Sequence, residues 1–171
     1  MNLPQSPSDQ YITLRNELAF ESVSFGSTTV NLFRTDELKE AQVGYSVGEH
    51  GESFTGEEEG DWRQQWFVIG YEDLCGDPIF VDLSNSELPV FTAAHGEGPW
   101  LPELIASSFN GFIKALEEVN AVSEGRQTPV ELERNPLSAS QREHALKKIA
   151  EANPHASLEF WAVWLGNFVD K

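Results

Sequence analysis

The pattern of apolar and polar residues along this 171-residue chain changes near residue 102. Before that point, short apolar runs rich in aromatic and β-branched residues are separated by Gly, Pro and Asp, which is typical of strands and turns. After it, apolar residues recur every three or four positions, which is typical of helices. Since strands come first and helices after, we predict an α+β fold in which helices cover a central antiparallel sheet.

The first strands are expected in residues 11–33, which carry many β-branched and aromatic side chains. Gly26 marks a turn within this segment, so the segment predicts a β-hairpin. A short helix is expected at residues 36–40, with Leu38 facing the core. Residues 44–61 are rich in Gly and Glu and predict a long exposed loop, with an irregular strand as the alternative.

Two nearly continuous apolar runs, residues 66–69 and 79–83, form the strongest segment of the chain. The Gly-Asp-Pro sequence at 76–78 separates them, so they predict two buried strands joined by a turn. A further strand begins at residues 87–91, where Pro89 suits a first strand position.

Three helices are expected in the second part of the chain. Pro102 and Glu103 predict the start of the first helix, which ends near residue 122. Ser140 and Glu143 have capping-box spacing and predict the second helix. The last segment has an aromatic row that favours a helix, with a strand as the alternative; we favour a core position over an exposed interface for its tryptophans. The row comprises Phe160, Trp164 and Phe168 at four-residue steps, with Trp161 and Leu165 beside it.

These patterns divide the chain into four segments. Residues 1–10 are expected to be a flexible N-terminus, and residues 11–122 the α+β domain. Residues 123–137, with two prolines, are expected to be a linker, and residues 138–171 a helical extension packed on the same domain. A hydrophobic content of 40% in a chain of this length suits one core.

Charge changes the picture of function more than of fold. The formal net charge is −17, and residues 1–110 hold 19 acidic and 4 basic residues against 9 and 7 in residues 111–171. Such a field repels phosphates, so we expect neither direct nucleic-acid binding nor membrane binding. It favours a basic protein partner; the alternative is that the charge only maintains solubility. The glycines within residues 49–61 argue against a rigid array of carboxylates that imitates nucleic acid.

Eight residues are candidates for partner binding. They lie in the acidic run of the long loop, in the turn between the two buried strands, and in the turn before Trp100. They are Glu57, Glu58, Glu59, Asp61, Glu72, Asp73, Asp77 and His95.

Catalysis finds little support in the sequence. A metal-dependent hydrolase built on Asp73, Asp77, Asp82 and His95 is the alternative from another class, since carboxylates and imidazole can hold a metal or transfer protons. We favour turn roles for these aspartates, which neighbour Gly and Pro. The chain contains no H-E-x-x-H, P-loop or G-x-S-x-G motif, so we expect no enzyme, cofactor or metal site.

One cysteine, Cys75, can form neither an internal disulfide nor a cysteine-based zinc site. The first residues of the sequence show no basic and apolar signal pattern. The expected compartment is therefore the cytoplasm.

A series of short motifs resembles the SUKH superfamily, the relatives of a yeast cell-wall-assembly regulator that include many bacterial toxin-immunity proteins. The motifs keep the order of the family and cover about half the chain, from Val30 to Leu116. They are residues 30–33 with 36–38, 66–70, 76–83, 89–91 with 95–96, and Trp100 followed by 105–109 and Phe112.

The resemblance implies a non-enzymatic fold that binds other proteins. It implies an immunity-type protein that neutralises a toxin domain, or alternatively a regulatory or scaffolding protein of the same fold. The family usually opens with helices, for which this sequence has little room before residue 20, and residues beyond about 123 lie outside the resemblance. The oligomeric state and the identity of the partner are not implied.

Overall fold

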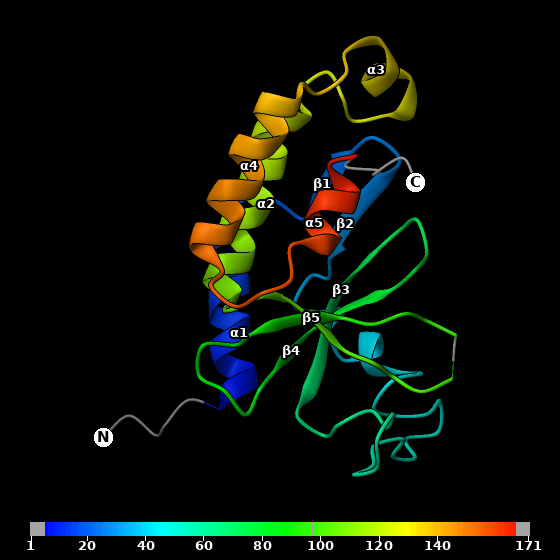
Figure 1. The fold of residues 1–171 in the computed structure, drawn as a ribbon. Coiled ribbons are helices and arrows are strands. Elements are labelled where there is room, and N and C mark those ends of the chain that lie inside the picture. Colours follow the sequence, from blue (N-terminus) through cyan, green and yellow to red (C-terminus); the bar gives the residue numbers. More distant parts are fainter. Residues whose placement is uncertain (1–5, 97, 167–171) are drawn as a thin grey trace.

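A computed structural model describes residues 6–96 and 98–166. One helix precedes a run of strands, and four helices follow, so that the chain has the predicted α+β class (Figure 1). The elements are α1 (Pro7–Asn16), β1 (Ser22–Phe25), β2 (Thr28–Leu32), a 3₁₀ helix (Glu40–Gln42), β3 (Trp66–Glu72), β4 (Pro78–Asp82), β5 (Val90–Thr92), β6 (Glu103–Ala106), α2 (Phe109–Ser123), α3 (Pro129–Arg134), α4 (Ala139–Ala152) and α5 (Glu159–Trp164).

The six strands form one curled antiparallel sheet in which strand order follows chain order. The predicted hairpin is confirmed: β1 pairs with β2, and Gly26 adopts a positive φ of 60° in the two-residue turn between them. Only glycine takes this backbone conformation without strain. The predicted strands at 66–69, 79–83 and 87–91 are also confirmed as β3, β4 and β5, with boundaries shifted by up to three residues.

The two faces of the sheet are covered differently. Ile79 and Val81 of β4 face the main core, which the helices complete. Phe80, between them, points to the other face and packs in a small aromatic cluster under the long loop. Trp62 is the centre of this cluster, 1% exposed, with its ring centroid 4.7 Å from that of Phe80. The long loop is therefore fixed to the sheet by a buried side chain.

Helices α2 and α4 lie side by side along one side of the molecule (Figure 1). Their close approach depends on Gly111, whose carbonyl accepts a hydrogen bond from the amide of Asn153 at 3.0 Å. The same amide donates to the carbonyl of Ile149, also at 3.0 Å, and its oxygen accepts from the N–H of Ser107. Asn153 is 2% exposed, so these bonds satisfy a buried polar group.

Helix α5 bridges the two ends of the curled sheet. Trp161 is fully buried, and its indole N–H donates to the carbonyl of Ile105 in β6 at 2.8 Å. The indole N–H of Trp164 donates to the carbonyls of Phe25 and Thr28 in the β1–β2 hairpin, at 3.3 and 3.2 Å. The helix and core predictions for this segment are therefore confirmed, while Phe168 lies outside the described residues.

The expectation of a strand from Tyr11 onward was wrong. Residues Pro7–Asn16 form α1, which overlaps the end of the segment predicted to be flexible. Ser6 caps this helix: its hydroxyl accepts from the N–H of Asp9, whose carboxylate accepts from the N–H of Ser6. This capping box and the proline at the first helical position outweigh the strand preference of the residues that follow.

The predicted start of the helix at Pro102 was wrong as well. Glu103–Ala106 form β6 beside β5, and α2 begins only after Ser108, whose hydroxyl accepts from the N–H of Gly111 at 2.9 Å. Pairing with β5 satisfies backbone N–H and C=O groups of residues 103–106, so these residues do not need the hydrogen bonds of a helix.

Smaller boundaries also differ. Ser138 rather than Ser140 caps α4, in a capping box with Gln141. Residues 36–39 form turns instead of the expected helix, and residue 40 begins the 3₁₀ helix, although Leu38 is buried as expected. The predicted linker contains α3, and it is attached to the hairpin because Gly26 donates its N–H to the carbonyl of Arg126 at 2.7 Å.

Candidate protein-binding surface

The turn between β3 and β4 holds three of the predicted partner-binding residues, and each stabilises backbone. The buried carboxylate of Glu72 accepts from the N–H groups of Leu74 and Cys75 at 2.9 Å and of Asp77 at 3.2 Å. Asp73 accepts from the N–H of Thr29 at the start of β2 at 2.6 Å, and Asp77 accepts from the N–H of His95 in the loop after β5. The local turn roles expected for Asp73 and Asp77 therefore differ from the bonds they make: Glu72 stabilises the turn itself, and the two aspartates connect it to other segments.

Two hydrogen bonds from the loop after β5 connect the acidic segments. The N–H of His95 donates to the carboxylate of Asp77 at 2.7 Å, and the N–H of Trp100 donates to the carbonyl of Gly60 at 2.8 Å. The structure therefore brings the β3–β4 turn and the acidic run of the long loop to the same side of the molecule, away from α2 and α4 (Figure 1).

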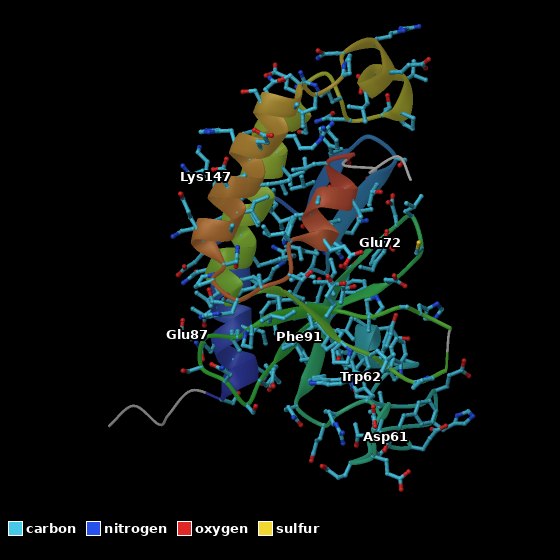
Figure 2. The ribbon with its side chains drawn as sticks, viewed as in Figure 1. Asp61, Trp62, Glu72, Glu87, Phe91 and Lys147 are labelled. Carbon is cyan, nitrogen blue, oxygen red and sulfur yellow. The ribbon has the colours of Figure 1, made fainter. Side chains whose placement is uncertain are left out.

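The acidic run at residues 57–61 exposes its three glutamates and is connected by polar contacts. Asp61 accepts from the N–H of Glu58 at 2.9 Å, and Glu57, with 96% of its side chain exposed, lies 3.8 Å from the guanidinium of Arg63. Trp62 anchors the run from below, and Figure 2 shows it next to Asp61 on the inner side of the loop. An exposed ion pair of this kind adds little stability, so the run remains available for a partner.

A groove lies between the β3–β4 turn, the loop leading into β6, and α5. Its volume is about 390 Å³. Three large apolar side chains on its walls are strongly exposed: Leu74 at 61%, Leu101 at 65% and Val163 at 50%. Phe160 of α5 also lines it. Sequence analysis did not find this groove, since single apolar residues in turns are common and the three segments are far apart in the chain.

The polar part of the groove is acidic. Four carboxylates line it, those of Glu72, Asp77, Glu103 and Glu159. No Lys, Arg or His lines it in residues 6–96 and 98–166. Glu103 stands out because its Oε1 is buried without a hydrogen-bond partner in the described part of the chain. A buried acceptor left in this state costs about 1–3 kcal/mol.

The thiol of Cys75 lies on the wall of this groove. The negative charge of Glu72, with smaller effects from burial and from Asp77, raises the pKa of the thiol above its ordinary value. The thiolate is the nucleophilic form, so this environment disfavours covalent catalysis.

The acidic side chains of this region are also poorly placed to bind a metal ion. Ligand atoms of Glu72, Cys75 and Asp77 lie within 4.8 Å of one another, but the oxygens of Glu72 already accept three backbone N–H bonds. Asp82 stands at the opposite end of β4, where it accepts from the N–H of Ser84 at 2.8 Å. Of the residues considered for a metal-dependent hydrolase, Asp77 and His95 are in contact, but through the backbone N–H of His95. Asp82 lies away from both.

Within the described ranges, no helix combines the length and the apolar character needed to cross a bilayer. Comparison of the chain with protein-family models, with curated proteins and with solved structures gives no match. The SUKH resemblance therefore stays a prediction from the sequence motifs.

Proposed function

We propose that this chain is a non-enzymatic protein-binding module that holds a partner through its acidic side. One observation carries the proposal: carboxylates gather around an exposed apolar groove, and no cationic side chain of the described residues lines it. Among the described residues, the ion pairs involve Arg34, Arg63 and Lys148, and none of them neutralises a carboxylate that lines the groove. A partner with a basic surface would supply the missing charge.

The distribution of charge over the molecule supports the same conclusion. Figure 2 places Lys147 on the outer side of α4 and Glu72 on the opposite side of the view. Residues 111–171 also hold seven of the eleven basic residues of the chain, so the excess of negative charge belongs to residues 1–110. A charge distribution as uneven as this accelerates encounter with a basic protein and orients it.

We further propose an immunity-type role, in which the partner is a toxin domain. The SUKH-like motifs support this narrower proposal, together with the charge that a basic, nucleic-acid-cleaving toxin would require. A regulatory or scaffolding protein of the same fold is the alternative, and its partner would be an endogenous basic protein rather than a toxin.

The test starts from the genes beside the one that encodes this chain. The C-terminal domain of a neighbouring secreted protein is expressed alone, and with this chain, in a bacterial host. We expect growth arrest by the domain alone, rescue by the chain, and a one-to-one complex on gel filtration. A complex without toxicity would support the regulatory alternative, and failure of every neighbouring product to bind would contradict the immunity role.

Charge reversal tests which surface is used. The triple change Glu57→Lys, Glu58→Lys and Glu59→Lys should weaken the complex at least about tenfold at low salt, because each reversal replaces attraction by repulsion. A matched triple change, Glu133→Lys, Glu143→Lys and Glu151→Lys, alters the net charge equally on exposed positions of α3 and α4. Equal affinities of the two triple variants would contradict binding through the acidic side.

A further inference from the structure

The groove beside α5 concentrates exposed apolar surface. Six large apolar side chains are strongly exposed in the described part of the chain, and three of them line this one groove. They come from the β3–β4 turn, from the loop before β6, and from α5. Side chains from three separate segments converge here without covering one another, which is typical of a surface that a partner covers.

The charge around these side chains restricts what the partner can be. The carboxylates of Glu72 and Asp77 already accept backbone N–H bonds, but Glu103 accepts none from the described residues, and its Oε1 is buried. Glu103 is half-buried and only this one of its two oxygens is buried, so a guanidinium or ammonium group from a partner can reach the carboxylate through the other oxygen and offset its charge. An acidic ligand would meet four carboxylates, and a second copy of this chain would bring its own net charge of −17.

We infer that the groove binds a segment of the partner protein in which an aliphatic side chain is flanked by Arg or Lys. The aliphatic side chain packs against Leu74, Leu101 and Val163, and a neighbouring guanidinium or ammonium group donates to Glu103. The volume of about 390 Å³ falls in the usual range of ligand pockets, about 300–1,000 Å³. This inference rests on the proposed function and names the chemistry of the segment recognised.

A peptide titration tests the inference on the full chain. The chain carries ¹³C-labelled Leu and Val methyl groups and is titrated at low salt with Gly-Lys-Arg-Leu-Arg-Lys-Gly. We expect saturable shifts of the methyl signals of Leu74, Leu101 and Val163. Replacing the peptide leucine by serine, or its four basic residues by glutamate, should weaken binding at least about tenfold, because each change removes one of the two interactions.

Matched variants locate the binding. Val163→Ser, or Leu101→Ser, should weaken peptide binding several-fold, whereas Val130→Ser should not, although Val130 on α3 is 54% exposed and Val163 is 50% exposed. Glu103→Gln keeps the shape of the side chain but removes its charge, and it should weaken binding of the basic peptide.

The outcomes separate this inference from the proposed function. If the leucine and serine peptides bind equally, or if shifts appear only around residues 57–61, the groove inference is overturned while a basic partner remains supported. If no peptide shifts the groove methyls, the inference is equally overturned. If the peptide fills the groove and Val163→Ser weakens the natural complex, but charge reversal at residues 57–59 does not, the inference stands and binding through the acidic run fails. A natural complex that is insensitive to Val163→Ser would overturn the inference.

Discussion

At the scale of single residues, Tyr11 shows how a polar group in the core affects stability. Its side chain is fully buried and packs edge-on against Phe109, with ring centroids 5.1 Å apart. Its hydroxyl has no hydrogen-bond partner in the described part of the chain. Burial raises the pKa of this phenol far above its ordinary value of 10, and the nearby charge of Arg15 opposes the rise only in part.

Removing this hydroxyl should therefore not destabilise the fold. We expect Tyr11→Phe to leave the free energy of unfolding at pH 7 unchanged or to raise it by about 1 kcal/mol, because an unsatisfied buried group is lost. Above pH 10 the unfolded chain loses the proton of Tyr11 more readily than the folded protein does, because the pKa is raised only in the folded state. The contribution of Tyr11 to the free energy of unfolding is therefore constant below pH 10 and falls as the pH rises above it. Urea unfolding between pH 7 and 11 should thus show a steeper alkaline loss for the unchanged protein than for Tyr11→Phe.

Tyr71→Phe serves as the control for this comparison, since it removes a hydroxyl from a side chain that is 37% exposed. A loss of more than about 1 kcal/mol in Tyr11→Phe at pH 7 would mean that the hydroxyl has a partner in solution, and would contradict the interpretation.

At the scale of elements, the contact between α2 and α4 depends on a missing side chain. A Cβ atom at position 111 would lie 2.8 Å from the carbonyl oxygen of Ala152 and closer still to the amide of Asn153. Both belong to the end of α4 that packs on α2, so Gly111 determines how near the two helices come.

Gly111→Ala should destabilise the protein by about 1–3 kcal/mol, because overpacking separates the helices and breaks the Asn153 bonds. This loss opposes the gain of up to about 1 kcal/mol that alanine brings to an isolated helix. Asn110→Ala is the matched control, since it raises helix propensity at the neighbouring exposed position. Chemical denaturation measures both; a stabilised Gly111→Ala variant would contradict the close contact.

Some of these elements could be predicted from sequence patterns and others could not. Strands β3 and β4 were predictable because their apolar runs have no alternative way to bury so many side chains. Helix α1 was missed because Tyr11 and Ile12 favour strands, while its cap lies in a short polar segment before them. The start of α2 was misplaced because Glu103–Ala106 become a strand only by pairing with β5, and such long-range pairing leaves little trace in local sequence.

The candidate surface, too, could be predicted from the sequence only in part. The predicted acidic residues do share one side of the molecule, although most of those in the β3–β4 turn also stabilise backbone. The groove could not be predicted, because Leu74, Leu101 and Val163 meet only in the folded chain. Neither periodicity nor spacing contains that information.

At the scale of the whole molecule, the net charge of −17 is poorly neutralised. The ion pairs of the described residues are few and mostly exposed, so they offset little of the repulsion between acidic loops. Repulsion of this kind destabilises a compact fold, and dissolved salt screens it.

The melting temperature should therefore rise by several degrees between 10 and 150 mM NaCl, where the Debye length falls from about 30 to about 8 Å. In the triple variant Glu57→Lys, Glu58→Lys and Glu59→Lys, the formal charge becomes −11 and the increase should be smaller. Differential scanning calorimetry of both proteins makes the comparison. A melting temperature that salt leaves unchanged would indicate that the repulsion is already balanced.

The bridge that α5 makes across the sheet has a consequence for folding kinetics. Trp164 bonds to carbonyls 139 and 136 residues earlier in the chain, so among the hydrogen bonds of the described residues these close the largest loops. Closing such loops is slow, and they are expected to form after the transition state. The groove includes side chains of α5, so it is complete only when this last step is complete. A ligand of the groove would thus distinguish the finished fold from its late intermediates.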